Sequence, residues 1–98
     1  MLLFVKQRFV DQIRAGTKTC EIRCGAKYRN VKVGDSLSIN GRFRLAITRV
    51  DVHSRDTLIR AGLVSRADLT DCYGAAAGPF YVFHFTRPTA ESSPQTAA

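Results

Sequence analysis

Apolar residues near the amino terminus recur at the spacing of a helix. Phe9, Val10 and Ile13 fall on one stripe within residues 7–15, and most of the remaining positions there are polar or charged. This spacing predicts a short amphipathic helix. Gly16 follows directly and suits the left-handed conformation in which helices commonly end. The pattern therefore predicts one helix that ends at a glycine.

Residues 18–24 alternate instead, which is the period of a strand with one buried face. The apolar face holds Cys20, Ile22 and Cys24, and the polar face holds Thr19, Glu21 and Arg23. Strict alternation places Lys18 opposite Glu21, so the two side chains can reach one cleft only if the strand twists or bulges at its start. The purely structural interpretation of Glu21 and Arg23 is an exposed ion pair on one face of the strand.

A hairpin is predicted in the middle of the chain. Residues 33–35 turn the chain into an alternating strand over residues 36–40, and Asn40-Gly41 is a strong signal for a two-residue turn. The partner strand begins at Arg42. Its apolar residues fall on odd-numbered positions up to Ile47 and on even-numbered positions from Val50. This change near Arg49 predicts a bulge or bend of the kind that closes a small barrel.

Two short helices are predicted after the hairpin. Ser54 suits the cap of a helix over residues 55–61, and Ser65 suits the cap of another over residues 66–73. Negative charge near a helix start is favourable because of the helix dipole. The acids assigned to positions in or near these first turns are Asp56, Asp68 and Asp71.

An aromatic-rich strand is predicted over residues 79–86, and we expect it to complete the barrel core. His84 lies on an apolar face of this strand and is expected to be a satisfied histidine of the core or its rim, while His53 ends a strand. Residues 88–98 have little to bury and predict a disordered tail. The folded domain is therefore assigned to residues 1–87.

Composition indicates one globular domain. The chain has 98 residues and an apolar content of 45%, which is enough for a modest single core. Residues 1–5 are apolar, but this run is too short for a signal peptide or a membrane span. We therefore expect a cytoplasmic protein that does not bind membranes, with a monomer as the default state.

The three cysteines, Cys20, Cys24 and Cys72, argue against a disulfide framework because their number is odd. On a regular strand, Cys20 and Cys24 would stand roughly 13 Å apart, too far to share a zinc ion. Free cysteines are often core residues, and we expect all three to be buried. No metal and no cofactor is predicted.

Positive charge is concentrated in the first half of the chain. The net charge is +7, and residues 1–49 hold eleven of the fifteen lysines and arginines against three of the eight acids. Arginine outnumbers lysine eleven to four, which favours planar recognition of phosphates and stacking on bases. RNA is therefore the leading partner, with DNA as an alternative. The alternative interpretation of this positive charge is a solvated surface that only keeps the protein soluble.

Short motifs occur in a fixed order along the chain. The segment Ala-Gly-Thr-Lys-Thr-Cys-Glu-Ile-Arg runs over residues 15–23, and Gly34-Asp35 follows at a predicted turn. ASCH domains begin with a strand and a helix, pass through Gly-x-Lys-Thr into a strand bearing Glu-x-Arg, and then show Gly-Asp. The chain resembles this family over roughly residues 2–87, in the form of a small single domain of bacterial or phage type.

The resemblance implies an α+β fold of the PUA-like type, with a five- to six-stranded mixed, barrel-like sheet and two or three short helices. It also implies binding of RNA or a nucleotide, which we place in a basic cleft beside Lys18, Glu21 and Arg23. Glutamate can accept a hydrogen bond from an exocyclic amine while cations hold the phosphate backbone. The predicted binding residues are Lys6, Arg8, Lys18, Glu21, Arg23, Lys27, Tyr28 and Arg29.

Tyr28 is included because it lies among basic residues in the connection over residues 27–32, a composition that can stack a base and hold its phosphates. The structural alternative for this connection is a mobile loop.

A small hydrolase is the first alternative function. Some bacterial relatives of the ASCH type hydrolyse the amide of N4-acylated cytidines with a lysine of the Gly-x-Lys-Thr segment, a threonine three residues later and a glutamate from the later helical region. Lys18 matches the lysine, but position 21 is Glu21, and no glutamate occurs between it and Glu91. Hydrolysis of N4-acylated cytidine or of RNA would use Lys18, Thr19 and Glu21, because a lysine in a partly dry cleft can act as base or nucleophile.

The second alternative function is a protein-interaction module. In that case the basic face of the domain would bind an acidic partner protein.

Overall fold

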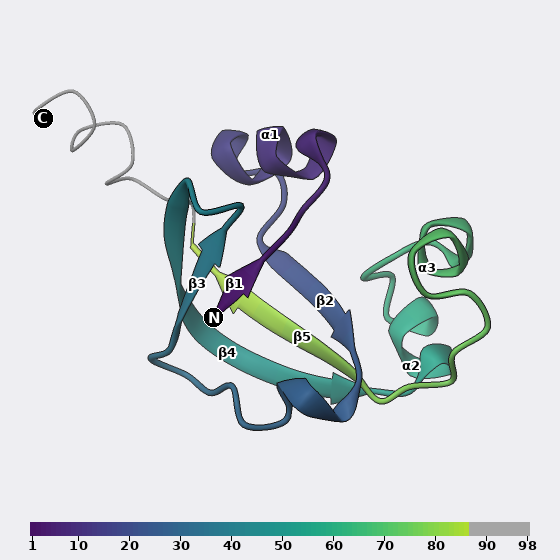
Figure 1. The fold of residues 1–98 in the computed structure, drawn as a ribbon. Coiled ribbons are helices and arrows are strands. Elements are labelled where there is room, and N and C mark those ends of the chain that lie inside the picture. Colours follow the sequence, from purple (N-terminus) through teal and green to yellow (C-terminus); the bar gives the residue numbers. More distant parts are fainter. Residues whose placement is uncertain (87–98) are drawn as a thin grey trace, which may run out of the picture.

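The computed structural model describes residues 1–86 as an α+β domain of five strands, three α-helices and one turn of 3₁₀ helix (Figure 1). The predicted tail over residues 88–98 lies outside the described residues. In chain order the elements are β1 (Leu2–Leu3), α1 (Gln7–Ala15), β2 (Cys20–Cys24), the 3₁₀ turn η1 (Ala26–Tyr28), β3 (Ser36–Ile39), β4 (Phe43–His53), α2 (Arg55–Arg60), α3 (Arg66–Tyr73) and β5 (Phe80–Phe85).

The strands form one mixed sheet in the order β1-β3-β4-β5-β2. β1 runs parallel to β3, and the other neighbouring strands are antiparallel. β1 and β2 lie at opposite ends of this order, so the sheet is open and the predicted barrel is not closed. β5, predicted to complete that barrel, instead lies between β4 and β2. At the outer edge of β2, the Tyr73 hydroxyl of α3 donates a hydrogen bond to the carbonyl of Ile22.

The predicted bend in β4 is confirmed and divides the sheet into two halves. The first half of β4 pairs with β3 up to Ala46, and the second half pairs with β5 from Ile47 to His53. The register shifts between Ile47 and Arg49. A bulge bends a strand and increases its twist, and Figure 1 shows β4 curving from one half to the other.

Two apolar clusters form on opposite faces of β5. Val10 and Ile13 of α1 belong to the first, and Leu58 of α2 and Leu69 of α3 belong to the second. The side chains of β5 alternate between the clusters: Tyr81, Phe83 and Phe85 face the first, and Phe80 and Val82 face the second. The single core predicted from composition is therefore two clusters, because helices cover both faces of this strand.

The predicted amino-terminal helix is confirmed, and the hairpin turn occurs at Asn40-Gly41 as predicted. Three residues rather than two separate the paired Ile39 and Phe43, so the partner strand begins one residue later than predicted. α1 spans residues 7–15, and Gly16 ends it with a φ of 83°. Asn40 and Gly41 have φ values of 54° and 70°, as a tight primed turn requires. The Asn40 side chain also accepts a hydrogen bond from the Val5 amide at 2.7 Å and donates one to its carbonyl at 2.9 Å. The turn therefore fixes the link between β1 and α1.

Both predicted serine caps are confirmed. Ser54 Oγ accepts a hydrogen bond from the Thr57 amide at 3.3 Å, and Ser65 Oγ accepts one from the Asp68 amide at 3.0 Å. The first of these helices ends one residue earlier than predicted, at Arg60. Asp68 lies in the first turn of α3, and Asp71 lies in the turn that follows.

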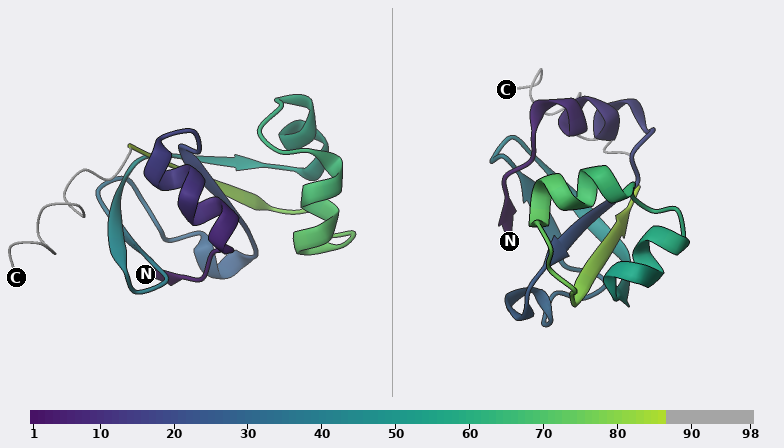
Figure 2. Two further views of the ribbon diagram at one scale, coloured as in Figure 1. Left: turned by 90° about the horizontal axis from the view of Figure 1, so that it is seen from above. Right: turned by 90° about the vertical axis from the view of Figure 1, so that its right-hand side faces the viewer.

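The helices lie on different parts of the sheet. The left view of Figure 2 shows α1 apart from α2 and α3, which lie next to each other. Within residues 1–86, no helix is both long and apolar enough to cross a membrane. The space between α1, β2 and α3 contains Lys18, Glu21 and Arg23, three of the residues that the sequence predicts to be functional.

Candidate functional site in the cleft between α1, β2 and α3

A cleft of two adjoining cavities lies between α1, β2 and α3. The larger has a volume of about 350 Å³, and its walls include Phe9 of α1 and the apolar residues Leu63 and Val64 that connect α2 to α3. The smaller has a volume of about 270 Å³. Both cavities are lined by Phe9, Glu21, Cys72 and Tyr73. Sites for small ligands commonly have volumes of this order and mostly apolar walls with a few polar groups.

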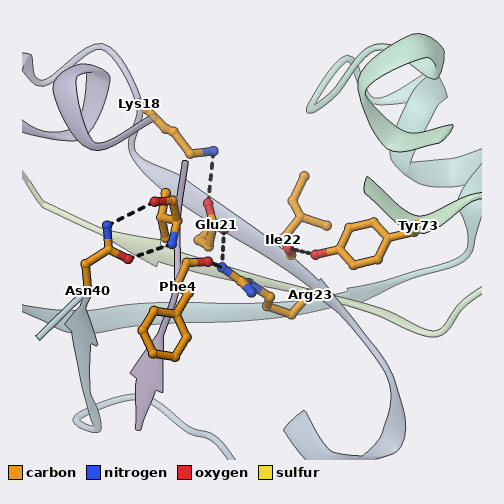
Figure 3. Close-up of polar contacts among 8 residues, drawn as sticks. Phe4, Lys18, Glu21, Ile22, Arg23, Asn40 and Tyr73 are labelled. Atoms are coloured by element: carbon orange, nitrogen blue, oxygen red, sulfur yellow. Dashed lines mark hydrogen bonds and ion pairs between the residues drawn. The ribbon is translucent and has the colours of Figure 1, made fainter. Parts of the chain in front are cut away.

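Three charged side chains meet at the floor of this cleft (Figure 3). The Glu21 carboxylate forms an ion pair with Lys18 Nζ at 3.3 Å through one oxygen, and with Arg23 Nη2 at 2.9 Å through the other. The side chains of Lys18, Glu21 and Arg23 are 20%, 10% and 17% exposed. The interpretation of Glu21 and Arg23 as an exposed pair is therefore wrong, and these three residues form a mostly buried triad.

The triad forms because Lys18 precedes β2 and does not follow its alternation. β2 begins at Cys20 rather than at residue 18, which corrects the predicted strand boundary. The amides of Thr17 and Lys18 both donate to the carbonyl of Gln12, at 3.0 and 3.1 Å, so this segment continues the turn at the end of α1. Since Lys18 lies outside the strand, its side chain can reach the face that carries Glu21.

Arg23 also connects the triad to the amino-terminal segment. Its Nη2 donates to the carbonyl of Phe4 at 2.9 Å as well as to Glu21, while its buried Nε has no hydrogen-bond partner. A buried donor without a partner has an energetic cost. The two contacts of Nη2 nevertheless fix the guanidinium between β2 and the link that precedes α1.

Two further ion pairs join α1 and its preceding residue to α3. Lys6 Nζ lies 3.0 Å from Asp71 Oδ2, and Arg8 Nη2 lies 3.9 Å from Asp68 Oδ1. The hydrogen bond from Lys6, together with the charge of Lys6, holds the pKa of Asp71 below its ordinary value. All four side chains are more than half exposed, and we call them the rim pairs.

The charges that line the cleft balance one another. The lining includes three cations and three carboxylates, namely Lys6, Lys18, Arg23, Glu21, Asp68 and Asp71. The sequence pattern predicts a basic cleft, because the acids of α3 are distant in the chain. Their positions three residues apart in one helix are the signal that could have placed them on one face.

The basic residues that follow β2 do not join this site. η1 lies beyond the end of β2 that is remote from α1 (Figure 1), and Lys27, Tyr28 and Arg29 do not line either cavity. Tyr28 is 8% exposed and packs edge-on against Phe83, with ring centroids 6.3 Å apart. The prediction that Tyr28 stacks on a base is therefore wrong for this conformation, because the ring is part of the first apolar cluster.

Thr19 and two cysteines lie at the same cleft. Thr19 is exposed and lines the larger cavity, and its carbonyl accepts a hydrogen bond from the Phe85 amide at 2.9 Å. Burial raises the pKa of the Cys20 thiol. Cys20 and Cys24 are partly buried against the second cluster, but Cys72 is exposed, which corrects the expectation that all three are buried. Within residues 1–86, no group of three or more histidine, cysteine or acidic side chains is placed to hold a metal ion.

The histidines lie outside the cleft and have local partners. His84 Nε2 lies 2.9 Å from Asp51 Oδ2, so the prediction of a satisfied histidine is confirmed. His53 Nδ1 lies 3.2 Å from the Thr57 hydroxyl. A hydrogen bond from Arg49 is the main cause that lowers the pKa of Asp51, with His84 contributing in the same direction.

Tyr73 fixes α3 to the free edge of β2, which makes it a structural part of the cleft wall. Its hydroxyl donates to the Ile22 carbonyl at 2.5 Å, and burial raises the pKa of the phenol to about 12. Because this pKa is raised above its unfolded value of 10.0, the neutral phenol stabilises the fold below pH 10 and this contribution is lost as the pH rises towards 12. The sequence offered no signal for this contact.

Replacing Tyr73 by phenylalanine should lower the free energy of unfolding by about 1 kcal/mol at neutral pH, because the Ile22 carbonyl loses its donor. The loss should shrink as the pH approaches 12, where the wild-type phenol ionises. Urea denaturation at a series of pH values measures both effects. A difference that stays constant from pH 7 to pH 12 would show that the phenol does not titrate as described.

No protein family model matches the chain, and no curated protein matches it in sequence.

Proposed function

We propose that the chain is a domain that binds RNA or a nucleotide, with the ligand seated in the cleft over the triad of Lys18, Glu21 and Arg23. The observation that carries this proposal is the convergence of three mostly buried charged groups at a cleft whose two adjoining cavities have volumes of about 350 and 270 Å³. Charged groups are seldom buried without a structural or functional role. The Gly-x-Lys-Thr and Glu-x-Arg motifs, which resemble those of ASCH domains, lie at this same place.

The chemistry of the cleft suits a nucleotide. Phe9, Leu63 and Val64 provide an apolar wall for a base or sugar ring. Glu21 can accept hydrogen bonds from an exocyclic amine or a sugar hydroxyl, and Lys18 can donate to a carbonyl or phosphate oxygen. We further propose that the domain is an open variant of the PUA-like fold, since its order of elements agrees with that resemblance while its sheet does not close.

Replacing Lys18 by alanine should weaken binding at least about tenfold, because hydrogen bonds to charged groups typically contribute 1.5–3 kcal/mol. Fluorescence anisotropy of a labelled twelve-nucleotide single-stranded RNA measures the affinity. Cytidine monophosphate and single-stranded DNA of the same sequence serve as competitors that rank the ligand classes.

Arg66→Ala is the matched control, since Arg66 is exposed at the start of α3 and does not line the cleft. It removes the same charge and should change the affinity less than twofold. Equal losses in the two variants would mean that binding depends on net charge and not on the cleft. Each phosphate neutralised on a single strand should add about 0.7 to the magnitude of the logarithmic salt slope, so a flat salt response would contradict phosphate recognition.

A hydrolase is the second candidate, because Thr19 lines the same cavity as Lys18. Both oxygens of Glu21 contact cations, which suits this carboxylate to orienting Lys18. Release of acetate from N4-acetylcytidine, or cleavage of RNA, by the wild-type protein but not by Lys18→Ala would favour this candidate over binding alone.

A further inference from the structure

The rim pairs connect the two walls of the cleft. The pairs between Lys6 and Asp71 and between Arg8 and Asp68 run from the start of α1 to α3. Lys6 and Asp71 line the smaller cavity, and Asp68 lines the larger one. A ligand that reaches the triad from this side therefore meets the two carboxylates and their cations first.

The rim pairs differ from the triad in their exposure to water. Their side chains are 54–59% exposed, whereas the triad side chains are 10–20% exposed. Exposed pairs are weak and exchange readily with other ions. Phosphate oxygens offer Lys6 and Arg8 the same negative charge and the same hydrogen-bond acceptors as Asp71 and Asp68 do.

We propose that Asp68 and Asp71 act as internal competitors for phosphate groups. In the free protein, Asp68 pairs with Arg8 and Asp71 pairs with Lys6. A ligand that carries two or more phosphates displaces both carboxylates when it binds. The identity of that ligand as RNA or a nucleotide rests on the proposed function, whereas the competition itself concerns any compound with several phosphates.

Two consequences follow from this competition. The acids reduce the affinity for all phosphate-bearing ligands, and they favour ligands with several phosphates over nucleosides, which cannot displace them. Arg8 is held in position during the exchange, because its guanidinium also lies 4.6 Å over the ring of Phe9. Arg8 therefore remains at the rim when its carboxylate is displaced.

The test compares two doubly substituted proteins of equal charge. D68N/D71N removes the rim carboxylates. D11N/D56N removes one acid from α1 and one from the first turn of α2, neither of which lines the cleft. Asp56 matches Asp68 in its place at a helix start, and Asp11 matches Asp71 in its place further along a helix.

Sodium tripolyphosphate and the labelled single-stranded RNA are the two probes. D68N/D71N should bind each of them at least about fivefold more tightly than wild type, while D11N/D56N should gain less than twofold. Equal gains in both proteins, or no gain in D68N/D71N, would overturn the proposal, since net charge alone would then account for the change. D71N, which removes the shorter rim contact, should show part of the gain.

A second comparison places the same substitutions in a K6A/R8A background. The gain from D68N/D71N should disappear there, because the carboxylates have no cations left to release. A gain in affinity that persists in this background would mean that the acids simply repel the ligand, and it would contradict the proposal. If tripolyphosphate shows the expected pattern but no RNA or nucleotide binds any of the proteins, the rim competition stands and the proposed function fails.

Discussion

Replacing Glu21 by glutamine should lower the free energy of unfolding by about 2–3 kcal/mol. The substitution keeps the volume of the side chain, but it leaves Lys18 and Arg23 without the carboxylate that lies 3.3 and 2.9 Å from them. Removal of one partner from a fully buried ion pair costs about 3–5 kcal/mol. A somewhat smaller loss is expected here, because the Lys18 side chain is 20% exposed. Urea denaturation followed by circular dichroism measures the change.

A double variant separates the electrostatic cause from a change in packing. The double variant K18M/E21Q also removes the Lys18 ammonium and leaves the amide of residue 21 beside Arg23. About half or more of the free energy of unfolding lost in E21Q should therefore be recovered. Asp35→Asn provides the comparison at the surface, because Asp35 pairs with a lysine that is 78% exposed. A loss from E21Q as small as that from Asp35→Asn would mean that the triad contributes little to the fold.

Replacing Phe83 by alanine should lower the free energy of unfolding by about 3–5 kcal/mol, the usual cost of deleting a buried aromatic side chain. Phe83 is fully buried in the inner strand β5 and packs against the ring of Tyr28. It also lies directly across the strand pair from Glu21. The cavity left by this change would therefore lie under the triad, and ligand binding should weaken together with stability.

Phe4→Ala is the matched control for Phe83→Ala. The same side chain is deleted, but Phe4 is 74% exposed. Little apolar surface is buried at this position, so a loss of less than about 1 kcal/mol is expected. Chemical denaturation of both variants under the same conditions gives the comparison, and similar losses would contradict the placement of Phe83 in the first apolar cluster.

Local features of the fold could be predicted well because they depend on residues close together in the chain. The amphipathic spacing over residues 7–15 and the glycine that follows are enough to define α1. Asn40-Gly41 selects its turn because both residues tolerate a positive φ. The phase shift near Arg49 marks a real bulge, although the same signal does not reveal whether the sheet closes.

The candidate site could be predicted only in part. Lys18, Glu21 and Arg23 do meet at one cleft, but alternation could not show that the strand begins at Cys20 and leaves Lys18 free to turn towards Glu21. The residues next to Tyr28 in the sequence are basic, and that composition does not reveal whether the ring lies in a mobile loop or in the core. Its burial depends on Phe83, which comes from a distant part of the chain.

The helices, caps, hairpin and bulge can be located from the order of residues alone, because each depends on backbone preferences and on side chains a few positions apart. Which polar groups are buried, and which charges face one another, depends instead on how distant segments pack together. The hydrogen bond between Tyr73 and Ile22 spans 51 positions, and the contact between Lys6 and Asp71 spans 65. Burial and charge balance depend on such distant neighbours, so the cleft and its rim exist only once α3 has docked beside β2.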